Sequence, residues 1–268
     1  RLVEFQIEKG VHGLFICGTY GSGPIMTVEE RKQVHEIVVD QVAGRITVIA
    51  HVGTTSTAQS VELARHAERV GADLVSSISP YYHRHDERAV LAYFEALAKA
   101  VDIPLYVYNN PKASGVTITP SFLSHLADAG VEGIKDSGFS FIELTHFMLA
   151  MQDRPAFRFI VGTEALALTA FMVGCKGSVA GLANGFPELV VQLWDLHQAG
   201  KYEQAVQMQM RVTKARQILH IPSSTNAACY VVLNERGIDV GQPKPPILPV
   251  KKDKAEAMLA AFREMGLL

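Results

Sequence analysis

A repeated pattern of helix, glycine turn and short apolar strand constrains this chain more than any other feature of its sequence. Four helix-like stretches end in a glycine that an apolar run follows at once: KGVHG (9–13), VGADL (70–74), AGVEG (129–133) and VGCKG (173–177). Glycine suits the left-handed backbone at a helix terminus, because it has no Cβ to clash there. Strands that alternate with helices in this way predict a parallel sheet covered by helices.

Seven short runs rich in Val, Ile and Leu have the character of strands that are covered on both faces. They are LFICG (14–18), TVIAHVG (47–53), LVSSIS (74–79), LYVYNN (105–110), GIKDSG (133–138), RFIVGT (158–163) and GSVAGLA (177–183). Helical patterns separate them at 27–42, 56–70, 87–101 and 119–129. The first of these helices begins with Thr27 and carries Glu30 three residues later, which is the spacing of a capping box.

The length and the element order favour a (β/α)8 TIM barrel. A closed barrel needs eight strands, so we expect the first strand to be missing from the given chain, and residues 1–187 to hold strands two to eight. Only helical patterns follow, at 188–199, 202–220, 224–236 and 252–265, and they predict a C-terminal helical extension over 188–268 that packs on the barrel. An open doubly wound sheet is the alternative, although no G-x-G-x-x-G motif follows an early strand.

The composition excludes several classes of protein. Hydrophobic residues make up 48% of the chain and the net charge is −2, without a basic stripe for nucleic acid or a membrane surface. No apolar run approaches the ~20 residues of a membrane span. The three scattered cysteines include no C-x-x-C pair, so we expect reduced thiols in a cytoplasmic protein. His83 and His85 are a weak metal-site candidate, and a solvated loop is the favoured interpretation of that segment.

Reactive side chains gather at the carboxyl ends of the strands in a parallel barrel. Lys135 lies inside the apolar run GIKDSG, Tyr108 ends the preceding strand, and Thr19 follows the first visible one. Burial lowers the pKa of a lysine, and the neutral amine can attack a ketone to form a Schiff base. A neighbouring tyrosine can carry protons during such a reaction, and a hydroxyl such as that of Thr19 can hold the tyrosine.

Structural interpretations of the same residues compete with the catalytic one. Lys135 could pair with Asp136, but adjacent residues of a strand point to opposite faces, which makes that pair geometrically poor. Tyr108 taken alone is more typical of a half-buried strand tyrosine. His51 is most simply a polar residue of the barrel.

Four motifs resemble those of the dihydrodipicolinate synthase / N-acetylneuraminate lyase superfamily of class I aldolases. They are GTYGSG (18–23), SPYYHR (79–84), YNNPKASG (108–115) and GIKDSG (133–138), in the family's order. The resemblance extends over nearly the whole chain, and it is the combination of the four motifs that makes it specific.

The resemblance implies catalytic roles and an assembly. Lys135 would form an imine with pyruvate or another 2-oxo acid, Tyr108 would relay protons, and Thr19 would be its hydroxyl partner. Members of the family use no cofactor and no metal in this chemistry. They are commonly homotetramers built as dimers of dimers, so the same assembly is expected here.

The resemblance also implies substrate contacts. Backbone N–H groups of Thr19 and Tyr20 would hold the substrate carboxylate. The main-chain carbonyl of Val179 would line the pocket, and Tyr82 matches a tyrosine that such enzymes lend across a dimer interface. Glu164 is the one acidic residue in the region where sialic acid lyases carry several for the sugar hydroxyls, which suggests a shorter hydroxylated substrate.

Departures from the motifs narrow the function further. Dihydrodipicolinate synthases carry an arginine two residues after the proline of the third motif, where this chain has Ala113, preceded by Lys112. The usual glutamate of the first motif is Ser22, and its second Thr or Ser is Tyr20. The segments IKDSG and GLAN are closer to those of 2-keto-3-deoxy-sugar-acid and 4-hydroxy-2-oxoglutarate aldolases.

The sequence therefore predicts a metal-independent carbon–carbon lyase that joins or separates pyruvate and an aldehyde, acting on a short 4-hydroxy-2-oxo acid or a 2-keto-3-deoxy sugar acid. Dihydrodipicolinate synthase and a 2-keto-3-deoxy acid dehydratase are alternatives that use the same imine. A catalytically silent barrel that binds a 2-oxo acid is the non-enzymatic alternative. A phosphate-handling isomerase ranks last, because GLANGFP (181–187) offers only two glycines.

Overall fold

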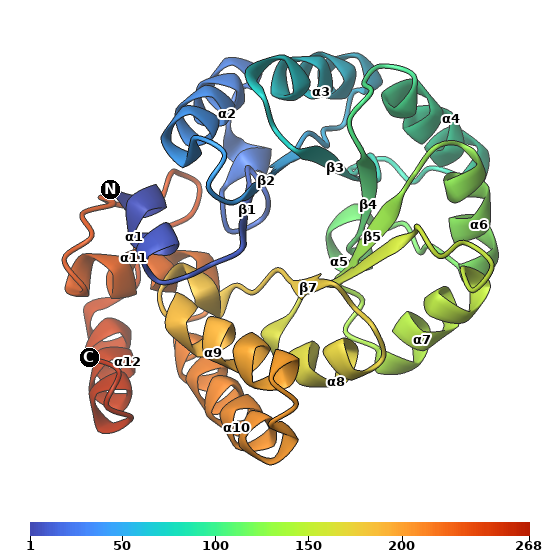
Figure 1. Ribbon diagram of the computed structural model, residues 1–268. Helices are drawn as coiled ribbons and strands as arrows, with labels where there is room; N and C mark the ends of the chain where they lie inside the picture. The colour runs from blue at the N-terminus through green and yellow to red at the C-terminus, as the bar shows by residue number, and fades with distance from the viewer. The chain divides into compact units, whose positions relative to one another are not determined.

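The computed structural model describes all residues from 1 to 268. Seven parallel strands form one sheet, and their order in space is their order in the chain, as Figure 1 shows. The strands are β1 (Gly13–Ile16), β2 (Thr47–His51), β3 (Leu74–Ile78), β4 (Leu105–Asn109), β5 (Gly133–Asp136), β6 (Arg158–Val161) and β7 (Gly177–Ser178). The fold is an α/β fold of the TIM-barrel kind, as the sequence predicts.

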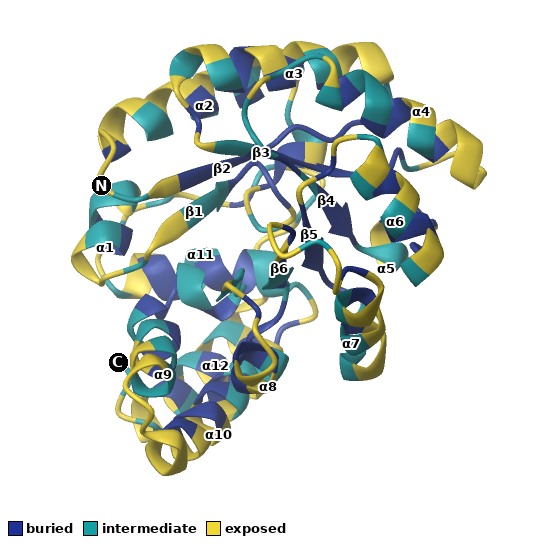
Figure 2. Cartoon of the chain, turned by 45° about the vertical axis from the view of Figure 1, so that its right-hand side comes forward, coloured by how far each residue is buried: buried dark blue, intermediate teal, exposed yellow.

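The chain divides into two compact units, of which the one formed by residues 13–162 and 173–178 contains the whole sheet. Its helices are α2 (Val28–Val42), α3 (Thr57–Val70), α4 (Glu87–Ala98), α5 (Pro111–Ser114), α6 (Pro120–Asp128) and α7 (Phe141–Ala150), with the 3-10 turn η1 (Gly23–Ile25). All but the short α5 lie outside the curved sheet (Figure 1). Apolar side chains between strands and helices form the core, including Leu63, Phe94, Phe122 and Ile134. Figure 2 shows that the exposed residues lie on the outward sides of the helices.

The other unit, residues 1–12, 163–172 and 179–268, is helical. It contains α1 (Leu2–Glu8), η2 (Glu164–Leu166), α8 (Ala167–Met172), η3 (Leu182–Asn184), α9 (Pro187–Gln198), α10 (Tyr202–Leu219), α11 (Thr225–Glu235) and α12 (Lys252–Glu264). The buried amide of Gln209 connects two parts of this unit, because it accepts from Leu168 N–H at 3.0 Å and donates to the Glu164 carbonyl at 3.0 Å. The predicted C-terminal helices are all present, whereas the domain boundary at residue 187 stays a prediction.

The glycine turns confirm the pattern that predicted the fold. Gly10, Gly71, Gly130 and Gly174 all have positive φ, between 82° and 109°. The capping box at the start of α2 is also present, since Glu30 N–H donates to Thr27 Oγ1 at 3.1 Å and Thr27 N–H donates to Glu30 Oε2 at 2.8 Å. None of the helices combines the length and the apolar character that a membrane span requires.

The predicted strands are longer than the observed ones, and the last shows the largest difference. The run 177–183 predicts a strand, but pairing with β6 ends at Val161 and Ser178, and Leu182–Asn184 form a 3-10 helix. Pairing stops because β6 itself ends at Val161, so the residues after Ser178 have no strand beside them. The residues predicted as strand that lie beyond the observed strand ends belong to the loops at the carboxyl edge of the sheet.

Replacement of Gly71 by alanine tests the turn that ends α3. Gly71 has a φ of +96°, where an L residue is strained, so Gly71→Ala should lower the free energy of unfolding by about 1–2 kcal/mol. The matched control is Gly177→Ala, because Gly177 has no positive φ and a Cβ there would meet nothing within 4 Å. Urea unfolding of both variants measures the difference; equal stabilities would contradict a conformational requirement at Gly71.

Candidate active site

Lys135 lies on the inner face of the sheet with its amine between two aromatic rings. Its Nζ is 3.6 Å from the centroid of the Phe15 ring and 3.8 Å from that of the Tyr108 ring. The side chain is 5% exposed, and no carboxylate pairs with it. Ring faces attract a cation, but they replace the lost hydration of an ammonium only in part.

The register of the sheet brings Lys135 to Tyr108. The two residues are direct partners in the parallel pairing of β4 and β5, so their side chains emerge side by side on the same face. The phenol of Tyr108 and the amine of Lys135 are therefore neighbours, as the sequence predicts. The rings of Phe15, His51 and Tyr108 lie together, with pairwise centroid distances of 5.8 to 5.9 Å.

Burial lowers the pKa of Lys135 from 10.5 to about 8, against a smaller opposite effect from Tyr108. A measurable fraction of the amine is then neutral near neutral pH, which is the state that can act as a nucleophile.

Polar side chains surround the phenol oxygen of Tyr108. Asn110 Nδ2 donates to it at 3.1 Å, and Thr19 Oγ1 lies 3.5 Å away. Burial alone would raise the pKa of Tyr108, but the charge of Lys135 and hydrogen bonding by Thr19, Ser137 and Asn110 together bring the pKa below its ordinary value. The contact between Thr19 and Tyr108 was expected from the sequence, whereas Asn110 was not.

Phe15, Asn110 and Ser137 are the site residues that the sequence did not reveal. A signal existed for Asn110, because it follows Tyr108 by two residues and such residues share one face of a strand. Nothing in the sequence marked Phe15 as a site residue. Its contact with Lys135 depends on how strands far apart in the chain are arranged in the sheet.

Asp136 faces away from Lys135 and pairs with a different residue. Asn109 Nδ2 donates to Asp136 Oδ1 at 2.7 Å, and Gly138 N–H donates to the same oxygen at 3.1 Å. Burial raises the pKa of Asp136, against the effect of these two hydrogen bonds. The alternative in which Lys135 and Asp136 form an ion pair is therefore wrong.

His51 is a buried polar residue of the sheet's inner face, in agreement with its interpretation from the sequence. Its Nε2 accepts from Ile78 N–H at 3.3 Å. Burial holds the pKa of His51 well below its ordinary value, and the nearby charges of Arg31 and Lys135 act in the same direction. The imidazole is thus neutral and adds no charge beside Lys135.

The loop after β1 is built around close backbone approaches. A Cβ at Gly23 would lie 1.8 Å from the carbonyl oxygen of Cys17, so only glycine fits there. Thr19 in this loop is exposed and Tyr20 is half-buried. The binding of a substrate carboxylate by the backbone of Thr19 and Tyr20 stays a prediction.

Tyr82 is 89% exposed and has a φ of +82°, an unusual backbone conformation for an aromatic residue. Its ring and that of His83 form a T-shaped pair, with centroids 5.0 Å apart. The prediction that it reaches a partner subunit stays open.

Glu164 and Val179 belong to the helical unit, which is described by itself. Glu164 is buried; its Oε2 accepts from Gly181 N–H at 3.2 Å, and its Oε1 lies 3.3 Å from Arg216 Nε. Burial raises the pKa of Glu164, against these contacts. The substrate contacts predicted for Glu164 and Val179 stay predictions.

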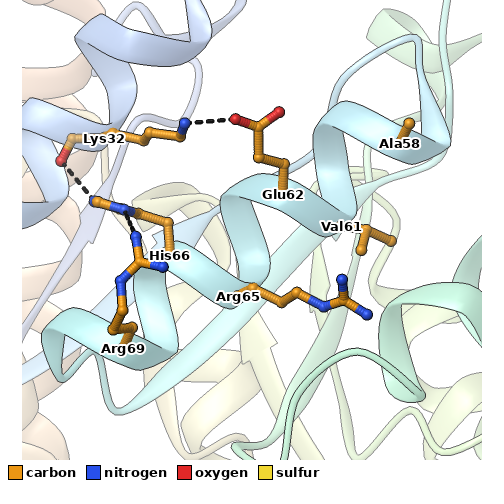
Figure 3. A pocket seen from close by; sticks show the side chains of 7 residues that line it. All are labelled: Lys32, Ala58, Val61, Glu62, Arg65, His66 and Arg69. Carbon is orange, nitrogen blue, oxygen red and sulfur yellow. Dashed lines mark hydrogen bonds and ion pairs between the residues drawn. The ribbon is translucent and has the colours of Figure 1, made fainter.

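A surface pocket of about 320 Å³ lies at α2 and α3, in the part of the sheet unit drawn in Figure 3. Its cations do not converge on a common point. Lys32 is bound to Glu29 and Glu62, Arg69 donates to His66 Nδ1 at 2.7 Å, and the guanidinium of Arg65 points away from both (Figure 3).

No group of three or more His, Cys, Asp or Glu side chains is arranged to hold a metal ion. Cys17, Cys175 and Cys229 are free and buried, and burial raises the pKa of each thiol to about 11 or 12. They are therefore thiols rather than reactive thiolates.

A parallel sheet of the TIM-barrel kind, with a buried lysine beside a tyrosine on its inner face, defines the class of this protein. The chain belongs to the dihydrodipicolinate synthetase family, whose sequence model matches residues 1–265. Members of this family are lyases and aldolases, so the chain is a lyase of this family.

Individual relatives agree with this assignment. An uncharacterized DapA-like lyase of Halobacterium salinarum is 36% identical over 98% of this chain and 85% of the relative. A 4-hydroxy-tetrahydrodipicolinate synthase of Parvibaculum lavamentivorans is 33% identical over 100% of this chain and 91% of the relative.

Two solved structures have closely similar folds. YagE of E. coli K12, a dihydrodipicolinic acid synthase family protein in complex with pyruvate, has a TM-score of 0.95 at 26% identity, and the match covers 100% of this chain and 91% of YagE. A variant of 2-keto-3-deoxygluconate aldolase from Sulfolobus solfataricus has a TM-score of 0.91 at 25% identity, with coverage of 99% and 88%.

The buried amine should make stability depend on pH in a definite direction. The pKa of Lys135 is near 10.5 in the unfolded chain and about 8 in the folded chain. Between these pH values the unfolded chain binds more protons, so the free energy of unfolding rises as the pH increases. Lys135→Met should raise the free energy of unfolding at pH 7 by on the order of 3 kcal/mol, and the gain should shrink toward pH 10.5.

Chemical unfolding at several pH values measures this effect. Lys176→Met is the control, because Lys176 is exposed and its replacement should change stability little at any pH. A Lys135→Met protein less stable than the unchanged one at pH 7 would contradict a desolvated amine.

Proposed function

We propose that the chain is a class I aldolase that forms or cleaves a carbon–carbon bond between pyruvate and an aldehyde through an imine on Lys135. The observation that supports this most is the burial of the Lys135 amine between two aromatic rings, which lowers its pKa to about 8. The reaction needs neither a metal nor a cofactor, because the iminium itself withdraws electrons from the adjacent carbon.

The neutral amine of Lys135 attacks the C2 carbonyl of the 2-oxo acid and gives a carbinolamine. Tyr108 donates its proton to the departing hydroxyl, which leaves as water, and the iminium remains. In the cleavage direction, the Tyr108 phenolate removes the proton of the C4 hydroxyl. The C3–C4 bond then breaks, the aldehyde departs, and the electron pair forms the enamine of pyruvate.

The assignment of Tyr108 to this relay rests on its register partner and its polar contacts. Its phenol is adjacent to the amine that reacts, and Thr19 and Asn110 both contact the phenol oxygen. We assign Thr19 to holding the phenol, and the backbone of Thr19 and Tyr20 to holding the carboxylate of the substrate.

The substrate is proposed to be a short 4-hydroxy-2-oxo acid or a 2-keto-3-deoxy sugar acid. Ala113 stands where dihydrodipicolinate synthases carry an arginine for a second carboxylate, which favours an aldehyde partner without one. Glu164 and the main chain of Val179 are the proposed contacts to the hydroxylated part. The structural similarity to a 2-keto-3-deoxygluconate aldolase also supports a 2-keto-3-deoxy sugar acid as the substrate.

A second candidate is 4-hydroxy-tetrahydrodipicolinate synthase, since relatives with that name align over the whole chain. Dehydration of a 2-keto-3-deoxy acid through the same imine is a third. The assembly proposed for all of them is a homotetramer, in which the exposed Tyr82 contacts a partner subunit.

Trapping of the imine tests the proposal directly. The protein is incubated with pyruvate, reduced with borohydride and weighed intact by mass spectrometry. A stable pyruvyl adduct is expected on the unchanged protein and should be absent from Lys135→Ala. No adduct on the unchanged protein would refute the imine, and an undiminished adduct on Lys135→Ala would place it elsewhere.

Replacement of Tyr108 separates proton relay from nucleophilic attack. Tyr108→Phe should lower turnover by roughly 10²–10⁴-fold, because the general acid and base is lost, while the trapped adduct still forms at long times. Turnover is measured as pyruvate release from a panel of 2-keto-3-deoxy acids and 4-hydroxy-2-oxo acids, which also ranks the substrates. Unchanged turnover in Tyr108→Phe would exclude the relay.

A further inference from the structure

The side chain of Asn110 lies against the phenol of Tyr108. Its Nδ2 donates to the phenol oxygen at 3.1 Å, whereas the hydroxyl of Thr19 is 3.5 Å from the same atom. Asn110 is therefore nearer to the phenol oxygen than Thr19, and it lies on the same side of the chain as Tyr108, two residues along.

The local backbone makes this contact possible. Asn110 precedes Pro111 and is the N-cap residue of α5, a position where an asparagine side chain normally accepts from its own helix. Here the side chain makes no capping hydrogen bond. The main-chain carbonyl of Asn110 instead accepts from Ala113 N–H and Ser114 N–H, both at 3.0 Å, which closes the first turn of α5 without using the side-chain amide.

We propose that Asn110 is a positioning residue of the proton relay, which donates a hydrogen bond to Tyr108 and stabilises the phenolate left when Tyr108 gives up its proton. The proposal rests on the proposed function and deepens it. It assigns a role to Asn110, a residue to which the family motifs give none.

The hydrogen count at the phenol oxygen explains what this contact does. The phenol carries one hydrogen. Because its oxygen already accepts a hydrogen bond from Asn110, the phenol O–H points elsewhere, toward Thr19 or the bound substrate. When the hydrogen passes to the departing hydroxyl of the carbinolamine, the oxygen becomes negative and the Asn110 N–H remains as a donor. A hydrogen bond to a charged oxygen is stronger than one to a neutral phenol.

Lys135, Thr19 and Ser137 also favour the phenolate, and Asn110 adds to them an amide N–H that donates to the phenol oxygen. Lys135 lies over the ring, with its Nζ 3.8 Å from the centroid, and its charge and its hydrogen bond to Tyr108 both favour the phenolate. His51 on β2 is neutral, and its ring centroid lies 5.9 Å from that of Tyr108. Phe15 contributes only an apolar ring at 5.8 Å. Ser137 favours the phenolate as Asn110 does, but it stands on the neighbouring loop after β5 and also donates to the Gly162 carbonyl at 3.4 Å.

Two substitutions at position 110 test the proposal. Asn110→Leu removes the donor at similar side-chain size, and Asn110→Asp keeps the shape but offers an acceptor in place of the N–H. Gln152→Leu is the control, because it removes an exposed amide distant in sequence from the site. Circular dichroism confirms that each variant is folded.

The first measurement is the titration of Tyr108 itself, obtained as the tyrosinate absorbance of each protein minus that of its Tyr108→Phe counterpart. Asn110→Leu should move this titration upward by about one to two pH units. Asn110→Asp should move it further, because the carboxylate repels the phenolate and accepts the phenol hydrogen. The Gln152→Leu titration should coincide with that of the unchanged protein.

The second measurement is the rate of pyruvate trapping by borohydride at timed intervals. Asn110→Leu should slow adduct formation on the order of tenfold to a hundredfold while the final yield stays the same, because Lys135 is untouched. Asn110→Asp should slow it as well, and Gln152→Leu should not.

The outcomes separate this proposal from the proposed function. If the unchanged protein forms no adduct, the imine fails, and the titration alone then decides on Asn110. If the adduct forms but both position-110 variants titrate and react like the unchanged protein, the role of Asn110 is overturned. If Asn110→Leu does not fold, the isosteric Asn110→Asp decides: an unshifted titration overturns the proposal.

Discussion

The parallel register of β4 and β5 is the constraint on which the whole candidate site depends. It pairs Tyr108 with Lys135 and, one residue on, Asn109 with Asp136. Because neighbouring residues point to opposite faces, the first pair lies on the inner face of the sheet and the second lies toward the helices. A shift of one residue would turn Lys135 into the apolar layer beneath the helices and separate it from Tyr108.

The separation of the two faces also keeps the amine reactive. Asp136 is adjacent to Lys135 in the chain, but its carboxylate bonds to Asn109 and to the Gly138 N–H on the other side of the sheet. A carboxylate beside Lys135 would raise the pKa of the amine and hold it protonated. The amine instead meets the rings of Phe15 and Tyr108, so desolvation dominates and the pKa falls to about 8. The cost of burying Lys135 is thus linked to its proposed reactivity.

The Asn109–Asp136 contact has a matching structural role on the outer face. It joins the ends of β4 and β5 directly behind the two residues that are proposed to react, through a 2.7 Å hydrogen bond in a buried setting. A buried carboxylate without such a partner would carry a large desolvation cost. The same short segments therefore hold the reacting pair on one side and the pair that aligns the strands on the other.

The order of helices and strands could be predicted from the chain, because glycine at helix ends, capping residues and apolar runs act over a few neighbouring residues. The placement of Lys135 beside Tyr108 also followed, since consecutive parallel strands are neighbours. The contact of Phe15 with Lys135, and the end of β7 at Ser178, could not be predicted in the same way. They depend on which face each strand turns inward and where its partner ends, and these are properties of the assembled sheet rather than of any local segment.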